Sequence, residues 1–289
     1  MESPTAAVGL GEILWDMLPM GRQLGGAPTN FAYHLNSLGV PTVPVSAVGV
    51  DELGDDIRAQ VANWGLSTEF LAIRPEYPTG TVTVALDAAG IPSYEIHTGV
   101  AWDHLPWTEA LAALAPTLRA VCYGTLGQRS PESHATIQSF LSATTPECLR
   151  VCDINLRQSF YSSALIQECL TLASVLKLNH EELPIIAEAC GVDSGTELET
   201  LTRLCERFDL RLVALTRGDK GSLLVTPTAT SEFPGIKVNV VDTIGAGDAF
   251  TAALVAGLLS GDSLEAINLA ANQKAAEVCQ HAGAIPGAE

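Results

Sequence analysis

The sequence has few basic residues. Lys and Arg together number 15 against 33 Asp and Glu, so the 289-residue chain carries a formal net charge of -18 at pH 7. Nucleic acids and anionic membrane surfaces are bound through basic patches, and this balance therefore argues against both as partners. A small phosphorylated ligand is not excluded, because a few placed cations can hold it inside an acidic protein.

Long apolar runs and paired cysteines are also missing. The longest apolar run follows Asp248 and falls short of the ~18 residues that a membrane-spanning helix needs. The 7 cysteines are odd in number and scattered, and no basic-then-apolar segment precedes them. Cys148 and Cys152 are too far apart for a Cys-x-x-Cys pair, and no second pair completes a zinc site. We therefore expect a cytoplasmic protein with reduced thiols.

Two common nucleotide-binding loops are absent. Neither the Walker A spacing, Gly-x-x-x-x-Gly-Lys-Ser/Thr, nor the dinucleotide spacing, Gly-x-Gly-x-x-Gly, occurs in the chain. The chain does have enough apolar residues, 47% of the total with 17% charged, to build a sizeable core. Its length of 289 residues suits one large α/β domain or two smaller ones.

Apolar, strand-like segments alternate with helix-like segments through most of the chain. The predicted strands cover residues 42–49, 119–124, 150–155, 175–179 and 210–216. Predicted helices between and beside them include residues 106–115, 130–143, 181–190 and 196–208. Repeated apolar strands separated by helices predict a parallel sheet that is covered on both faces. Ligands on such sheets bind at the carboxyl ends of the strands.

The N-terminal third departs from this alternation. Residues 6–15 read as one strand that runs into a polar end at Asp16. Residues 79–87 and 91–96 read as strands around an Asp87–Gly90 turn, and with no helix between them they should pair antiparallel. We expect this pair outside the main sheet, with an extra hairpin at the sheet edge as the alternative.

The most informative stretch lies near the C-terminus. Residues 238–241 are β-branched and strand-like, whereas residues 249–259 form an apolar, helix-competent run, and Gly245, Gly247 and Asp248 stand between the two. The first turn of a helix has unpartnered N–H groups and a positive dipole end, and glycines let the backbone wrap closely around an anion. One interpretation is an anion site with Asp248 beside it, and the other is a glycine turn with a capping Asp.

The full string Asp-Thr-Ile-Gly-Ala-Gly-Asp-Ala-Phe, residues 242–250, is similar residue by residue to the C-terminal signature of the ribokinase-like (PfkB) family of carbohydrate kinases. The resemblance implies that Asp248 is the base that deprotonates the sugar hydroxyl. It also implies that the amides of Gly245, Ala246 and Gly247 form the anion hole for the transferred phosphoryl group.

The same resemblance implies an α/β fold. It would be a three-layer αβα sandwich with a mainly parallel central sheet and a small β-strand lid. Residues 1–289 would form a single domain, and the lid would be made of segments near 10–24 and 79–100.

A second motif, Gly25-Gly26-Ala-Pro-Thr-Asn30, resembles the N-terminal signature of this family. Without the resemblance it is a helix entry with a polar face residue. The resemblance implies sugar contacts from Asp16, Gly25, Gly26 and Asn30. Arg157, in an Asp-x-Asn-x-Arg match, would contact sugar or phosphate, and a surface turn is its alternative. The sequence of residues 11–35 resembles that of bacterial fructokinases in particular.

The remaining matches concern ATP and cations. Glu182 ends an Asn-x-x-Glu match and would lie near the Mg²⁺–phosphate water network, although a helix cap would explain the same residues. Asp242 and the Ile244 carbonyl are candidate ligands of a monovalent cation such as K⁺. The loop 216–222 matches a nucleotide-binding turn, and its alternative is a plain hairpin. The resemblance implies ATP contacts at Asn179, Thr216, Gly218, Lys220, Gly221, Gly245, Gly247 and Asn272.

We therefore expect an ATP-dependent sugar kinase, and in particular a fructokinase that makes fructose 6-phosphate. The alternatives are the same scaffold acting on ribose, 2-keto-3-deoxygluconate, a nucleoside or a sugar phosphate, and a catalytically silent binding relative. A silent relative should have lost Asp248 or the paired glycines, and both are present. Lid strands with open edges often pair between subunits, so we also expect a homodimer through the lid.

Overall fold

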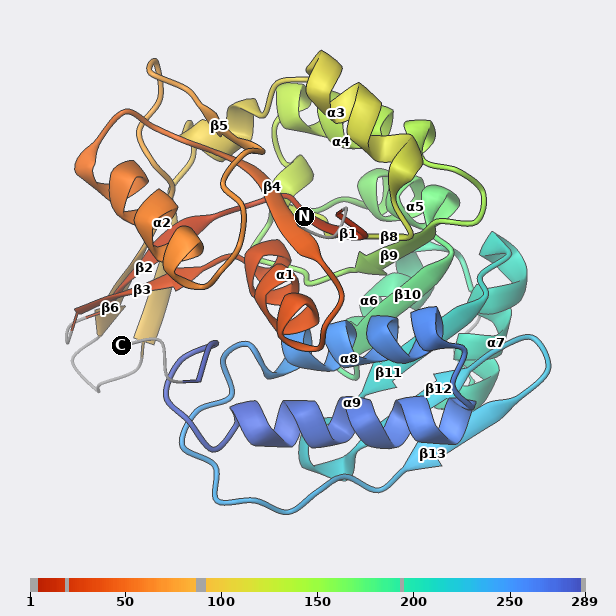
Figure 1. Ribbon diagram of the computed structural model, residues 1–289. Helices are drawn as coiled ribbons and strands as arrows, with labels where there is room; N and C mark the ends of the chain where they lie inside the picture. The colour runs from red at the N-terminus through yellow and green to blue at the C-terminus, as the bar shows by residue number, and fades with distance from the viewer. Residues whose placement is uncertain (1–4, 19–20, 87–91, 193–194, 287–289) are drawn as a thin grey trace.

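The chain folds into two sheets and nine main helices within residues 5–18, 21–86, 92–192 and 195–286, which are the parts that a computed structural model describes (Figure 1). The larger sheet has nine strands in the order β13-β12-β11-β10-β9-β8-β1-β4-β5. The smaller sheet has four strands in the order β3-β2-β6-β7.

The strands of the larger sheet are β1 (Ala7–Leu10), β4 (Thr42–Val48), β5 (Leu71–Ile73), β8 (Ala120–Tyr123), β9 (Leu149–Asp153), β10 (Val175–Asn179), β11 (Leu212–Thr216), β12 (Ser222–Val225) and β13 (Thr230–Phe233). Those of the smaller sheet are β2 (Leu14–Leu18), β3 (Gly21–Gly25), β6 (Thr81–Leu86) and β7 (Pro92–Ile96). The helices are α1 (Ala27–Ser37), α2 (Glu52–Asn63), α3 (Glu109–Leu114), α4 (Pro131–Ala143), α5 (Ser163–Leu172), α6 (Glu182–Ala189), α7 (Glu197–Phe208), α8 (Ala246–Ser260) and α9 (Leu264–Val278).

The larger sheet is parallel from β5 to β11, and only β12 and β13 run antiparallel to their neighbours. Helices α1, α8 and α9 cover one face, where Phe31 and Phe250 meet the sheet. Helices α3 to α7 cover the other face, through residues such as Phe140 and Ile166. The predicted αβα sandwich with a mainly parallel sheet is therefore confirmed. Within the described ranges, no helix is long and apolar enough to cross a bilayer.

Two sequence predictions were wrong in detail. Residues 6–15 do not form one strand, because β1 ends at Leu10, Gly11 adopts a φ of 149°, and β2 begins in the other sheet. Residues 238–241 form no strand either, and they run as a loop with Val240 and Val241 60% and 65% exposed. Their main chain bonds to the end of α9 instead, where Val241 N–H donates to the Cys279 carbonyl.

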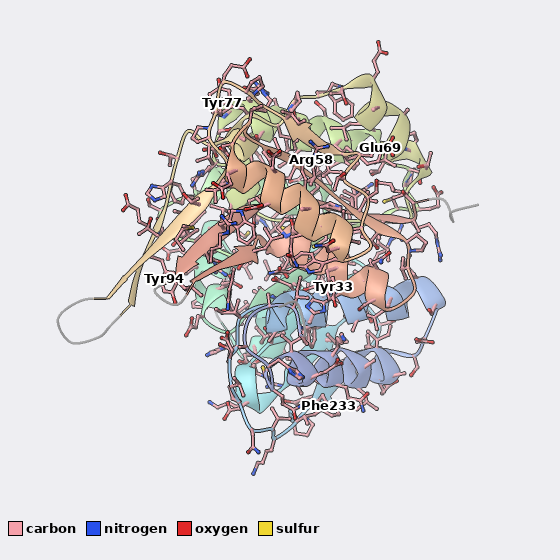
Figure 2. The ribbon with its side chains drawn as sticks, turned by 60° about the vertical axis from the view of Figure 1, so that its left-hand side comes forward. Tyr33, Arg58, Glu69, Tyr77, Tyr94 and Phe233 are labelled. Carbon is pink, nitrogen blue, oxygen red and sulfur yellow. The ribbon has the colours of Figure 1, made fainter. Side chains whose placement is uncertain are left out.

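The smaller sheet projects from the main body (Figure 1). Strands β6 and β7 pair antiparallel, as the pattern predicts, and the Asp87–Gly90 turn lies outside the described residues. Figure 2 shows Tyr94 on this projecting part, where its side chain is exposed. At the entry to β6, Asp51 caps α2 through Gly54 N–H and also accepts the Thr79 N–H at 2.8 Å. The Asp51 carboxylate therefore holds the start of β6 against the start of α2.

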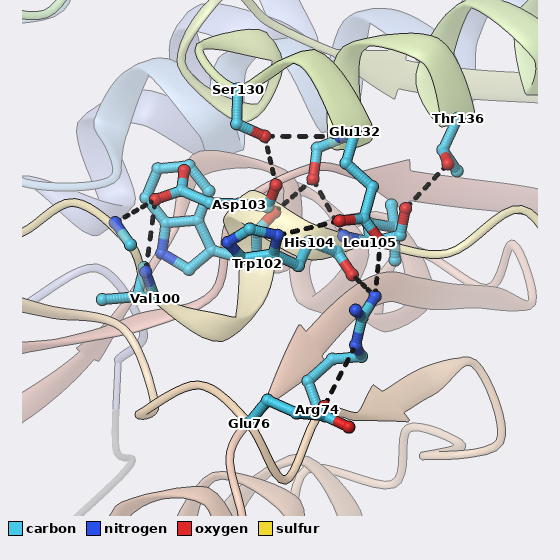
Figure 3. A network of polar contacts seen from close by, with 12 residues as sticks. Arg74, Glu76, Val100, Trp102, Asp103, His104, Leu105, Ser130, Glu132 and Thr136 are labelled. Carbon is cyan, nitrogen blue, oxygen red and sulfur yellow. Dashed lines mark hydrogen bonds and ion pairs between the residues drawn. The ribbon is translucent and has the colours of Figure 1, made fainter.

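A buried ion pair holds the segment that follows β7, the last strand of the smaller sheet. Arg129 donates from Nε and Nη2 to the two carboxylate oxygens of Asp103 at 2.7 and 2.9 Å, and both side chains are 4% exposed. Asp103 belongs to the short helix η1 (Ala101–His104), which follows β7. A more exposed network of Arg74, His104 and Glu132 fastens the same segment to α4 (Figure 3).

Replacing Arg129 with Met should destabilise the protein strongly, because it leaves a buried carboxylate without its partner. Breaking such a pair typically costs about 3–5 kcal/mol. The matched control is Arg74→Met, since its partner Glu132 is 43% exposed and such pairs contribute about 0–1 kcal/mol. Urea unfolding of both variants measures the two losses, and an equal loss would contradict the importance of the buried pair.

Candidate active site

The sequence-predicted residues gather at the carboxyl edge of the larger sheet. Asp153, Asn179 and Thr216 are the last residues of β9, β10 and β11, and Asn179 lies directly opposite Thr216. The N-terminus of α8 meets this edge, because the Thr251 hydroxyl donates to Asp153 Oδ2 at 2.8 Å. The site therefore lies where parallel α/β sheets bind ligands.

The N-terminus of α8 is shaped by Gly245. This residue is the N-cap of the helix, has a φ of 75°, and provides no side-chain cap. A Cβ on Gly245 would lie 2.5 Å from the Ala284 Cβ, so only glycine lets the C-terminal segment pack here. The dipole end of α8 is thus free of a capping side chain and suits an anion.

Asp248 stands in the first turn of α8 and is joined to α1. Asn30 donates from Nδ2 to Asp248 Oδ2 at 2.8 Å, which links two motifs 218 residues apart in the sequence. Burial and the charge of Asp153 raise the pKa of Asp248 to about 6, although the Asn30 hydrogen bond and Lys177 oppose the shift. A carboxyl with this pKa is ionised at neutral pH and is a stronger base than an ordinary aspartate.

Lys177 lies under the first turn of α8. Its Nζ donates to Asp153 Oδ1 at 3.0 Å, and a Cβ on Gly247 would lie only 2.9 Å from this nitrogen. Burial alone lowers the pKa of an ammonium group, but the nearby carboxylates Asp153, Glu182 and Asp248 raise the pKa of Lys177 above its ordinary value. A permanent positive charge therefore stands beside the glycine backbone.

The smaller sheet brings Asp16 to the glycine turn. A Cβ on Gly25 would lie 2.5 Å from Asp16 Oδ2, so the missing side chain leaves room for the carboxylate. Burial raises the pKa of Asp16 to about 6, and the Arg157 charge opposes the shift. Asp16 lies opposite Val82 in the sheet, and Val82 belongs to an apolar cluster with Leu14, Ile96, Trp102 and Phe160. This end of the site combines an acid with an apolar wall.

Glu12 lies just below this turn. It is 3% exposed, its Oε1 accepts the Ala27 N–H at 3.3 Å, and its Oε2 has no hydrogen-bond partner. Burial raises the pKa of Glu12 to about 7, and the charge of Asp248 adds to the shift. Arg157, which is exposed, lowers the pKa values of Glu12, Asp16 and Asp248, so its charge reaches all three carboxyls.

The predicted nucleotide residues follow along the same edge. Glu182 is buried and accepts the N–H groups of Leu156 and Asn179 at 2.9 and 2.8 Å. Gly218 and Gly221 have positive φ values, and Lys220 between them is exposed. Asn272 is buried, and its amide nitrogen donates to Ser222 and Asn268 inside the protein.

Asp242 ties two loops together. Its Oδ1 accepts the N–H groups of Thr243 and Ile244 at 2.7 and 3.1 Å, and its Oδ2 accepts Gly283 N–H at 2.9 Å. These bonds hold the segment before α8 against the C-terminal segment.

A model of the pfkB family carbohydrate kinases matches residues 18–289. The chain belongs to this family. It is 31% identical to a fructokinase of Klebsiella pneumoniae, over 96% of this chain and 91% of that protein. A solved sugar kinase of Pyrococcus horikoshii is 27% identical with a TM-score of 0.81, over 98% of this chain and 93% of that one. A fructokinase of Xylella fastidiosa has a TM-score of 0.83 over 98% of this chain and 95% of that one, and at 22% identity this likeness shows the fold alone.

Sequence reasoning missed two charged residues of this carbohydrate kinase. Lys177 interrupts the apolar run 175–178, and a single lysine in a buried strand is a signal of an internal partner. Glu12 similarly stands among apolar residues at the end of β1. Neither charge could be assigned a partner from the sequence, because Asp153, Asp248 and Ala27 are brought to them only by the fold.

The raised pKa of Glu12 has a consequence for stability. Its pKa of about 7 lies above the ordinary value of 4.5, so the fold favours the protonated form. Stability is therefore lost as the pH rises through about 7, by up to about 3 kcal/mol. Glu12→Gln should remove this loss. The unfolding free energy of the variant minus that of the wild type should therefore be larger at about pH 8.5 than at about pH 5. Urea unfolding at the two pH values measures this, and an unchanged difference would contradict it.

Proposed function

We propose that this carbohydrate kinase is a fructokinase, which transfers the γ-phosphoryl group of ATP to D-fructose and makes fructose 6-phosphate. The observation that carries the proposal is the position of Asp248, a carboxyl of raised pKa in the first turn of α8 that Asn30 joins to the sugar end. The identity of 31% with the Klebsiella pneumoniae fructokinase supports fructose as the sugar.

Asp248 is the general base in this proposal. The sugar hydroxyl would lie beside its carboxylate and pass a proton to it as the oxygen attacks the γ-phosphoryl group. A pKa of about 6 suits this role, because the group is ionised at neutral pH and still accepts a proton readily. Asp16, Gly25, Gly26 and Asn30 would hold the other hydroxyls and so orient the attacking one.

The first turn of α8 and Lys177 would stabilise the transferred group. The amides of Gly245, Ala246 and Gly247 stand at the positive end of the helix, and Lys177 Nζ lies beside Gly247. Such fixed donors and charges act where negative charge develops, and losing one typically costs about 2.7–4 kcal/mol of transition-state stabilisation. Lys177 thus adds a side-chain cation to an anion hole made of backbone.

The triphosphate would lie along β10 and β11, near Asn179, Thr216, Gly218, Lys220 and Gly221. The Pyrococcus horikoshii sugar kinase has been solved in complex with ATP, which supports ATP as the donor. Mg²⁺ supplies charge neutralisation for the phosphates. Glu182 would hold its waters, and no group of three or more His, Cys, Asp or Glu forms a cage among the described residues. Asn272 would face the adenine with the part of its amide that Ser222 and Asn268 leave open.

The smaller sheet would act as a lid over the sugar. It carries Asp16 and is rooted in the main body at Thr79 and Asp103. Closing it would exclude water from the site and prevent idle hydrolysis of ATP. We further propose that Asp242 and the Ile244 carbonyl hold a monovalent cation and that the lid edges pair in a homodimer. Activity in K⁺ against Na⁺ and sedimentation at assay concentration test these two points.

One observation favours a second sugar. Arg157 is exposed at the sugar end, and the hydrogen bond that the structure gives it is a weak one to the Leu156 carbonyl at 3.2 Å. A guanidinium group in this position suits a substrate carboxylate. The alternative substrate is therefore an acid sugar such as 2-keto-3-deoxygluconate.

Asp248→Asn should lower kcat by at least about 10²-fold, because a positioned base typically contributes 10²–10⁴-fold. The affinity for sugar should change much less, because the amide keeps the shape of the side chain. Steady-state kinetics with fructose and Mg·ATP measure both quantities. Asp209→Asn is the matched control, since Asp209 is exposed at the end of α7 with a φ of 51° that Asn also adopts. A near-native kcat for Asp248→Asn would contradict the assignment of Asp248 as the general base.

The substrate is tested by ADP release from Mg·ATP with fructose, ribose, glucose, mannose, 2-keto-3-deoxygluconate and adenosine. We expect fructose to have the highest kcat/KM. A higher value for 2-keto-3-deoxygluconate, lost on Arg157→Gln, would replace fructose with the acid sugar and keep the mechanism. No turnover of any of these compounds would overturn the proposed function.

A further inference from the structure

Glu12 has a position that the proposed reaction does not use. Its Oε1 accepts the N–H of Ala27, the first helical residue of α1, and the N-cap Gly26 provides no side-chain hydrogen bond of its own. Gly26 packs directly on the Glu12 main chain, because a Cβ there would lie 2.4 Å from the Glu12 carbonyl oxygen. The Glu12 carboxyl is therefore part of the support of the Gly25–Gly26–Ala27 turn.

The second oxygen of this carboxyl is unsatisfied. Glu12 Oε2 is buried and has no hydrogen-bond partner. Beside it lies a cavity of about 10 Å³, lined by Glu12, Asp153, Asn155 and the backbone of Gly124 among others. The lining also includes apolar residues such as Pro28 and Leu126. A cavity of this size has room for one water molecule at most. An oxygen buried at such a place needs either a proton or a water molecule.

The charges around Glu12 favour the proton. Asp248 faces it from α8, and Asp153 lines the same cavity from β9, although Lys177 of β10 neutralises Asp153. Arg157, in the loop after β9, is the cation whose charge reaches Glu12, and the buried thiol of Cys122 lines the cavity from β8. An ionised Glu12 would add a second negative charge close to Asp248, the proposed base.

We propose that Glu12 is a proton-linked positioning residue: its carboxyl is neutral when the sugar is bound, and in this form it supports the glycine turn without adding charge beside Asp248. The proposal rests on the proposed function, because it assumes that the sugar lies against Gly25, Gly26 and Asp248. Its chemistry is the binding of one proton together with one sugar molecule.

A proton linkage follows from this proposal. The pKa of Glu12 is about 7 in the free protein, and a bound sugar removes water from the site, which favours the neutral carboxyl further. Above that pH, each sugar molecule that binds takes up close to one proton. The dissociation constant for the sugar should then rise by up to tenfold per pH unit in the wild type. Glu12→Gln carries a permanently neutral group, so its dissociation constant should stay nearly constant over the same range.

The test is titration calorimetry of fructose binding between about pH 6 and pH 9, in pairs of buffers that differ in ionisation enthalpy. We expect the wild type to take up protons at the alkaline end and Glu12→Gln to take up almost none. Glu12→Asp keeps a titratable carboxyl and should restore the uptake. Glu132→Gln makes the same chemical change in the exposed Arg74–His104 network and should behave as the wild type.

A wild type whose fructose affinity is independent of pH, or a Glu12→Gln variant with undiminished proton uptake, would overturn the proposal. The wild-type titration requires no variant, so the proposal is tested even if Glu12→Gln does not fold. If Glu12 had a purely structural role, Glu12→Gln would lower the melting temperature of the protein and leave its proton uptake on fructose binding unchanged. Failure of the proposed function gives a different result, because the wild type would then phosphorylate no sugar of the panel.

Discussion

The hydrogen bond between Asn30 and Asp248 is the contact that holds the candidate active site together. It joins the first turns of α1 and α8, which lie side by side on one face of the larger sheet (Figure 1). Each helix begins with a glycine at its N-cap, Gly26 and Gly245 respectively. The candidate site is therefore built on the N-termini of two neighbouring helices, and a small shift of either helix would separate Asn30 from Asp248.

The site also shows how a strongly acidic protein handles an anionic substrate. Its positive charges are few: the buried Lys177 beside Gly247, the dipole of α8, and the exposed Arg157, whose charge reaches Glu12, Asp16 and Asp248. Around them stand carboxyls with raised pKa values, namely Glu12, Asp16 and Asp248. Because burial raises these pKa values, part of the negative charge that the sequence suggests is neutralised near neutral pH. Net charge alone is thus a poor guide to the charge that a ligand meets.

Much of the fold was predictable from the sequence, because buried parallel strands and their covering helices have distinct patterns. The predictions failed where a segment looked apolar but had no partner strand. Residues 238–241 are rich in β-branched valine, yet β13 already ends the sheet, and the Val241 N–H bonds to the Cys279 carbonyl at the end of α9. Residues 6–15 looked continuous because side-chain pattern does not reveal that Gly11 sends the chain from one sheet to the other.

The site residues that belong to long motifs were also predictable, and the isolated ones were not. Asp248 and Asn30 belong to long sequence motifs, and in the structure Asn30 Nδ2 lies 2.8 Å from Asp248 Oδ2. Lys177 stands alone in an apolar strand, and Glu12 lies in the stretch 11–35 but had no role assigned to it, because the partners of both side chains are distant in the sequence. The unpartnered oxygen of Glu12 is a property of the packed structure, since only packing decides which buried groups lack a partner.

The path of the chain between β1 and α1 has a mechanical consequence. The hairpin β2–β3 leaves the main body after Glu12 and rejoins it at Gly26, and it holds Asp16 between these points. A rotation of this hairpin would have its pivot at Glu12 and Gly26, which pack directly against each other. Opening the site would therefore also twist the support of α1 and move Asn30 relative to Asp248. The position of the smaller sheet and the alignment of Asn30 with Asp248 are thus coupled through one short stretch of backbone.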